Sequence, residues 1–150
     1  MRTMTDVHTV QKAAFYFGVA NLAVGIAGFI GPFVTGNDDG IINISPGYLF
    51  GILGINWLHA ATHILFGVAG MAVRARYDSS VAYMWVVAVV FAAMAAMGFM
   101  QFGMQPGLYS VMGMTVDRNG NVVHTVLALI GLYFALRPHA GETRHRAATY

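Results

Sequence analysis

Four long apolar stretches, separated by short polar ones, dominate the chain. They run from about residue 13 to 33, from 49 to 73, from 81 to 104 and from 121 to 136, and the pattern leaves open whether the second begins at residue 49 or nearer Asn56. A helix needs roughly 20 apolar residues to cross the ~30 Å hydrocarbon layer of a bilayer, and only the last stretch is short by that measure. Because lipid cannot satisfy an open backbone, each stretch is expected to be helical. The pattern predicts four transmembrane helices.

The composition agrees with this pattern. Hydrophobic residues make up 57% of the 150 residues and charged residues only 9%, whereas soluble domains carry about 25% charged residues. We therefore predict an all-α fold, an integral membrane four-helix bundle, as one domain over residues 1–150 with a polar tail at 138–150. The lipid bilayer is the expected partner, and a net charge of +2 without a basic cluster argues against nucleic acid. The absence of Cys excludes disulfides and thiol chemistry.

The basic residues predict an orientation in the membrane. Seven of the 8 Lys and Arg residues precede the first stretch, lie between the second and third, or follow the fourth. Arg118 is the single basic residue in the alternate loops, which cover residues 34–48 and 105–120. Since basic residues concentrate on the cytoplasmic side, both termini are expected in the cytoplasm.

Several landmarks occur twice, in the same order along the chain. The first half contains Gly28-Phe29, Pro46-Gly47 and Asn56-x-x-His59, and the second half contains Gly98-Phe99, Pro106-Gly107 and Asn121-x-x-His124. This order favours two parallel two-helix repeats related by an axis near the membrane normal. In that alignment His59 and His124 would occupy equivalent positions.

Three histidines lie inside the predicted spans. His59 and His63 are four residues apart and therefore share one helix face, and His124 comes from the fourth stretch. Ionisable side chains inside a bilayer are costly and usually functional. Neutral imidazoles could ligate haem iron, chlorophyll magnesium or a transition metal. His59, His63 and His124 are therefore candidate cofactor ligands, with haem or chlorophyll as the cofactors considered and the identity of any metal left open.

A structural role for these histidines is the alternative. Side chains that could hydrogen-bond with them across helices lie close by in the sequence, at Asn56, Thr62, Asn121 and Thr125. Such bonds stabilise membrane bundles by about 0.6–2 kcal/mol each. The histidines would then hold the helices together rather than bind a cofactor.

Methionines at helical spacing in the third stretch raise the possibility of copper. Thioethers bind copper, but Met also fills gaps in helix packing. The stripe consists of Met94, Met97, Met100 and Met104. Packing is the simpler interpretation of this stripe.

The sequence thus leaves two classes of function open. No carboxylate lies in any predicted span and no nucleophile–base arrangement is visible, which argues against a proton-coupled transporter and against an enzyme. The first class is a non-catalytic accessory or structural subunit of a membrane complex, with other subunits or a second copy as partners. The second is a tetrapyrrole-binding subunit of an electron-transfer or light-harvesting complex.

Two motifs carry a resemblance to a known family. The run Phe17-Gly18-Val19-Ala20-Asn21-Leu22 and the motif Asn56-x-x-His59-x-x-x-His63 resemble an uncharacterised family of small four-pass bacterial membrane proteins, known only as a domain of unknown function. In that family an Asn commonly follows the first His, whereas this chain has Ala60. The resemblance implies a four-helix membrane fold and no activity. Together with the charge pattern it predicts a multi-pass protein of the bacterial inner (plasma) membrane.

Overall fold

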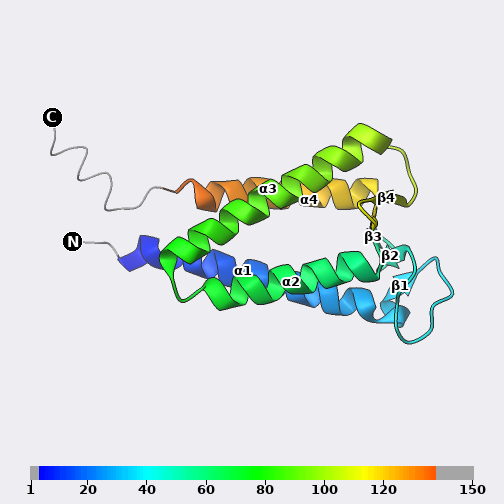
Figure 1. The fold of residues 1–150 in the computed structure, drawn as a ribbon, viewed down its shortest axis with the longest axis horizontal. Coiled ribbons are helices and arrows are strands. Elements are labelled where there is room, and N and C mark those ends of the chain that lie inside the picture. Colours follow the sequence, from blue (N-terminus) through cyan, green and yellow to red (C-terminus); the bar gives the residue numbers. More distant parts are fainter. Residues whose placement is uncertain (1–3, 138–150) are drawn as a thin grey trace.

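Four helices make up most of the protein (Figure 1). The computed structural model describes residues 4–137, so the predicted polar tail at 138–150 lies outside the described residues. The helices are α1 (Met4–Phe29), α2 (Trp57–Val73), α3 (Tyr77–Phe102) and α4 (Arg118–Ala135). A one-turn 3-10 helix, η1 (Gly31–Phe33), follows α1. The start of α1 and the end of α4 lie at the same end of the molecule (Figure 1).

Short strands occupy the opposite end of the molecule (Figure 1), and they correct the prediction of an all-α fold. One antiparallel sheet has the order β1-β2-β3, and the second is the hairpin β4-β5. Within the described residues the chain is therefore mostly helical with two small sheets. The strands are β1 (Val34–Thr35), β2 (Gly47–Leu49), β3 (Leu53–Ile55), β4 (Tyr109–Val111) and β5 (Met114–Val116).

The two hairpins turn in the same unusual backbone conformation. Phe50 and Gly51 have φ angles of 51° and 74°, and Met112 and Gly113 have φ angles of 51° and 81°. Two successive positive φ angles match the right-handed twist of a hairpin, and Gly adopts them without steric cost. Apolar composition could not reveal these turns, because the residues around them are as hydrophobic as those of a span.

The second helix begins at the later of the two starts that the sequence left open, next to Asn56 rather than at residue 49. Residues 47–55 form the first hairpin, and α2 begins at Trp57. Asn56 is extended (φ −141°, ψ −179°), and its side-chain oxygen accepts the backbone N–H of His59 at 3.1 Å. This is an N-cap, which satisfies a backbone donor that the first helical turn leaves free.

The helices pack as two antiparallel pairs, α1 with α2 and α3 with α4 (Figure 1). Each pair contains a helix, a hairpin and a capped helix in the same order, although the first pair also includes η1 and β1. Asp117 is the N-cap of α4, as Asn56 is of α2. Aligning these caps places His63 opposite His124, which corrects the predicted equivalence of His59 with His124. The counterpart of His59 is Gly120.

The first helices of the two pairs follow the same alignment. A Cβ atom placed on Gly28 would touch Ala60, and one placed on Gly98 would collide with the amide of Asn121. Ala60 and Asn121 are counterparts in the alignment set by the caps. In both halves, a glycine of the first helix thus lies against the equivalent position of the second helix. The repeat therefore extends to the close packing of the helices as well as to the order of elements.

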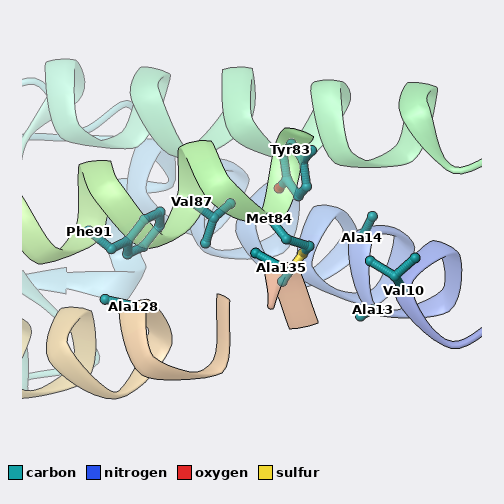
Figure 2. Close-up of a cluster of buried hydrophobic side chains, with 9 residues drawn as sticks. All are labelled: Val10, Ala13, Ala14, Tyr83, Met84, Val87, Phe91, Ala128 and Ala135. Carbon is teal, nitrogen blue, oxygen red and sulfur yellow. The ribbon is translucent and has the colours of Figure 1, made fainter. Parts of the chain in front are cut away.

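An apolar cluster joins the two pairs near the end that is remote from the strands. Its members come from α1, α3 and α4, and Figure 2 shows the side chains. The hydroxyl of Tyr83 donates to the carbonyl oxygen of Phe66 at 3.0 Å, so the one polar atom of the cluster is satisfied. The cluster comprises Val10, Ala13, Ala14, Tyr83, Met84, Val87, Phe91, Ala128 and Ala135.

Polarity is partly inverted relative to a protein folded in water, because the exterior is apolar and some polar side chains lie inside together with the apolar core. Large apolar side chains are exposed along all four helices, including Ile26, Leu65, Val89 and Leu129 at 49%, 69%, 61% and 62% exposure. Two helical segments, Thr9–Phe29 and α3, are long and apolar enough to cross a membrane, which suggests membrane association. Polar side chains are instead buried, among them Asn21, His59, Ser80, Asn121 and His124.

Candidate functional site

Three histidines converge between the two helix pairs. One ring nitrogen each from His59, His63 and His124 lies within 4.8 Å of the others. The rings of His59 and His63 are stacked, with centroids 4.9 Å apart and planes 25° apart. The ring of His124 lies 5.6 Å from that of His59 and 6.2 Å from that of His63. The structure thus brings together all three histidines that the sequence singled out.

Helix geometry and the two caps explain why the rings meet. His59 and His63 are one turn apart on α2 and therefore project from the same face. Each N-cap fixes where its helix begins, so His63 and His124 lie at matching heights on α2 and α4. The cluster lies in the first turns of both helices, close to the strands.

His59 is held by a backbone carbonyl of the other helix pair. Its Nδ1 lies 2.7 Å from the carbonyl oxygen of Thr115 in β5, and the side chain is buried. A carbonyl oxygen only accepts, so Nδ1 carries the proton and donates it. In the neutral ring Nε2 then carries the lone pair, which makes it the ligating atom.

His63 is held in the same tautomer by Asn21 of α1. Its Nδ1 lies 2.8 Å from the side-chain oxygen of Asn21. The orientation of that amide is fixed because its nitrogen donates to the carbonyl oxygen of Phe17 at 2.8 Å. Histidines that bind metals typically donate their second ring N–H to such an acceptor, which orients the ring.

His124 differs because its Nδ1 is buried and has no hydrogen-bond partner among the residues that the structure describes. Phe91 of α3 packs edge-on against this ring, with centroids 5.1 Å apart and planes 88° apart. Phe91 is the counterpart of Asn21, since each lies two turns before the Gly-Phe pair of its helix. A buried polar atom without a partner costs free energy and requires an explanation.

Two cavities flank the cluster. The larger has a volume of about 250 Å³ and is lined mainly by apolar residues of α1, the first hairpin and α4. The smaller has a volume of about 40 Å³, and its walls include Met94 and Met114. All three histidines line both cavities. Space is therefore available next to the imidazole nitrogens on two sides.

The polar residues predicted beside the histidines have different roles. The hydroxyls of Thr62 and Thr125 donate within their own helices, to the carbonyl oxygens of Leu58 and Asn121, both at 2.9 Å. Such back-bonding keeps a hydroxyl satisfied without linking helices. Asn56 does link the pairs, because its amide nitrogen donates to the carbonyl oxygen of Gly113 at 2.9 Å.

The methionine stripe does not converge on the site. Met94 is buried and lines the small cavity. Met100 and Met104 are 86% and 60% exposed. The structure therefore places Met94 of this stripe beside the histidines and leaves Met100 and Met104 at the surface.

Two N-cap side chains, one of them missed by sequence reasoning, bind the repeats together reciprocally. Asp117 accepts the N–H of Gly120 at 2.9 Å and also the N–H of Gly54, in the opposite hairpin, at 2.9 Å. Asn56 likewise accepts the N–H of Thr115, in the opposite hairpin, at 3.3 Å. Sequence reasoning overlooked Asp117 because it lies before the apolar stretch. An Asp immediately before the start of a helix is nevertheless a recognisable N-cap signal.

Asn21 was also missed as a site residue. It is the only Asn in the apolar stretch from 13 to 33, and a polar side chain inside a predicted span is a functional signal in itself. What the sequence does not contain is the pairing of Asn21 with His63, because that contact joins residues far apart in the chain. Thr115 was invisible for a different reason, since it contributes only its backbone.

A separate polar cluster organises the loop before β2. The carboxylate of Asp39 accepts the N–H groups of Ile44 and Ser45, both at 2.6 Å, and the hydroxyl of Ser45 at 3.0 Å. The backbone N–H groups of Ser45 and Ile44 lower the pKa of Asp39 below its usual value. These bonds occupy the carboxylate within the loop, so Asp39 serves as a loop brace.

The fold and the site define a mostly helical protein with an apolar exterior and an interior cluster of three histidines. Residues 11–137 match the family described as a domain of unknown function (DUF4383), and the chain belongs to that family. This confirms the resemblance seen in the sequence. No curated protein and no solved structure matches the chain.

Replacing Asp117 tests the reciprocal caps. Asp117→Ala removes the acceptor of a helix-capping N–H and of the Gly54 N–H, and we expect a loss of about 1–3 kcal/mol in the free energy of unfolding. Asp117→Asn retains a good cap and should lose less. The exposed Asp38→Ala serves as the control. Thermal unfolding in detergent measures the effect, and equal midpoints for Asp117→Ala and Asp38→Ala would contradict the role of this cap.

Proposed function

We propose that this chain is a four-pass integral membrane protein that binds one transition-metal ion through His59, His63 and His124. The observation that carries the proposal is the meeting of three imidazole nitrogens within 4.8 Å in the interior. Two of the three rings donate their Nδ1–H groups to oxygen acceptors, so in the neutral rings Nε2 carries the lone pair that would ligate the ion. The function is therefore metal binding within the membrane, without an assigned reaction.

The inverted polarity supports the membrane part of the proposal. The helical segments 13–29, 57–73, 79–102 and 119–135 contain no Asp, Glu, Lys or Arg. Asp78 and Arg118 lie just before the third and the fourth of these segments. Their exposed residues are large and apolar, which suits hydrocarbon as the surrounding solvent. At 1.5 Å per residue α2 and α4 are about 26 Å long, and the adjoining hairpins would extend them toward the outer surface. The distribution of basic residues supports an orientation with both termini on the cytoplasmic side of a bacterial inner membrane.

A purely structural role explains the cluster less well than metal binding does. The Nδ1–H groups of His59 and of His63 donate to Thr115 and Asn21, as a structural role would also predict, but a structural role does not require ring nitrogens of all three histidines to converge. His124 keeps a buried nitrogen without a partner among the described residues. Nitrogen ligands around a metal ion lie about 2.0–2.1 Å from it and hence about 3.3–3.5 Å from one another. Binding one ion would therefore bring the three nitrogens closer together than the 4.8 Å within which they now lie.

The charges around the cluster favour a singly charged ion. The three imidazoles are neutral ligands, and the nearby side chains of Met94 and Met114 are uncharged thioethers. The cost of burying an ion grows with the square of its charge, so a doubly charged ion costs about four times as much. Copper(I) is the singly charged ion that imidazole and thioether ligands select. We therefore propose copper(I) as the bound ion.

A tetrapyrrole is the alternative that the sequence raised, and the dimensions of the site do not favour it. The larger cavity, about 250 Å³, is smaller than the roughly 300–1,000 Å³ of pockets for drug-sized ligands. Phe91 packs against both His124 and His63 and so fills one side of the cluster. An accessory role in a larger complex remains compatible with a bound copper ion, and lipid is the partner that the exposed residues fit.

Cysteine labelling tests the four-pass arrangement, because the natural chain has no Cys. Single cysteines at Gly40, Ser110 and Ala75 sample three different connections between helices. A membrane-impermeant maleimide should label Gly40→Cys and Ser110→Cys on intact cells. Ala75→Cys should react only after the membrane is permeabilised. Labelling of Ala75→Cys on intact cells to the same extent as Ser110→Cys would contradict the topology.

Copper titration tests the site itself. The protein in lipid nanodiscs, under reducing conditions, should take one copper(I) per chain from a chromophoric chelator. Replacing any of the three histidines by Ala should weaken binding by more than the 10–100-fold that is typical of losing a supporting group. Asn21→Leu removes such a supporting group from His63 and should fall within that range. His8→Ala, at the start of α1, is the matched control.

Two outcomes would contradict metal binding at this cluster. One is equal copper affinity in the wild type and in the three histidine variants, which would assign the copper to another site. The other is a Soret or red chlorophyll band in the purified protein that disappears in His59→Ala and His63→Ala. That band would establish the tetrapyrrole alternative.

A further inference from the structure

The two halves of the site are not equivalent, and the difference leaves an opening beside the cluster. The caps align His63 with His124, but the counterpart of His59 is Gly120. The second repeat therefore contributes one imidazole where the first contributes two. A fully symmetric site would have a fourth histidine at position 120. In its place, Gly120 forms part of the wall of the larger cavity.

This cavity has the size and the lining for a small uncharged molecule. Its volume is about 250 Å³, and an apolar cavity of about 150 Å³ can hold benzene or xenon. Besides the three histidines, the walls consist of apolar residues, Tyr16 and Asn21. The amide of Asn21 is already engaged with Phe17 and His63. Of the polar side chains that line the cavity, His59, His63 and His124 are therefore the ones that could bind a metal ion.

The cavity borders the lipid-facing surface. Tyr16 of α1 and Val123 of α4 both line it, and they are 66% and 38% exposed. These two helices belong to different pairs, so the cavity lies at the seam between the pairs. A molecule dissolved in hydrocarbon could enter between α1 and α4 without passing through water. A charged molecule would have to give up its hydration on this path, which is costly.

We propose that the metal ion held by the three histidines keeps an open coordination position that faces this cavity and takes a small, uncharged, lipid-soluble ligand. The inference rests on the proposed copper site. Sites with three protein ligands commonly retain a position for an exogenous ligand. The asymmetry between His59 and Gly120 supplies that position here, and the apolar walls select against ions. Carbon monoxide is a suitable probe, since it is small, uncharged and binds copper(I).

The experiment uses the copper(I)-loaded protein in lipid nanodiscs, with copper content measured first in every sample. Carbon monoxide should give one infrared band of bound CO per copper, with saturable binding. Azide, a small anion, should not displace it at equal concentration. Ala20→Phe places a large side chain in the cavity and should retain copper while CO affinity falls at least tenfold. Ala92→Phe, at an exposed position of α3, is the matched control, and Val123→Phe is a second variant that fills the rim.

The outcomes separate the two proposals. Absence of copper in the wild type overturns both the proposed function and the open position. Copper without a CO band overturns the open position alone and leaves a closed copper site. CO binding with wild-type affinity in both Ala20→Phe and Val123→Phe shows that the ligand does not use this cavity. Displacement of CO by azide points to access from water rather than from lipid. Each of the last three results leaves copper binding intact.

Discussion

Two capping side chains hold this protein's halves in register, and the rest of the structure depends on them. Asn56 and Asp117 each begin a helix and, with the same oxygen atom, bind the backbone of the opposite hairpin. Each bond by itself contributes about 1 kcal/mol. In an apolar surrounding, however, an unsatisfied backbone group costs several kcal/mol. The paired arrangement is therefore strongly favoured over any sliding of one repeat against the other.

The histidine cluster is a consequence of this register. Because both helices start from caps that face each other across the hairpins, His63 and His124 meet at the same height. His59 then joins them from one turn earlier, oriented by the Thr115 carbonyl that belongs to the opposite repeat. The cluster thus lies at the interface between the halves, where any change in their packing would change the spacing of the three imidazoles.

The near-symmetry of the fold explains both what the site contains and what it lacks. Asn21 and Phe91 are counterparts, and one holds His63 by a hydrogen bond while the other packs against His124. His59 and Gly120 are counterparts, and the missing ring coincides with the larger cavity. An arrangement with three imidazoles and one open side thus arises from two halves that share the order helix, hairpin and capped helix but differ in these two pairs of side chains.

The sequence predicted the four helices and the shared face of His59 and His63, because both depend on local pattern. Four apolar stretches located the four helices, and the spacing of His59 and His63 placed them on one face. It failed at the hairpins, since residues 47–55 are apolar enough to continue a span, and only the positive φ angles of Phe50 and Gly51 reveal the turn. The sequence comparison paired Asn56 with Asn121, whereas the structural counterpart of Asn56 is Asp117. The two caps have different side chains, so residue identity alone did not reveal the correct alignment.

The central claim is that three histidines from the two halves share one copper ion. X-ray absorption at the copper edge of the copper(I)-loaded protein tests it most directly. The account predicts three imidazole nitrogens at about 2.0 Å, and the loss of one imidazole from this shell in His124→Ala. A shell of two nitrogens that is unchanged in His124→Ala would contradict it, because copper would then be held within one half of the molecule alone.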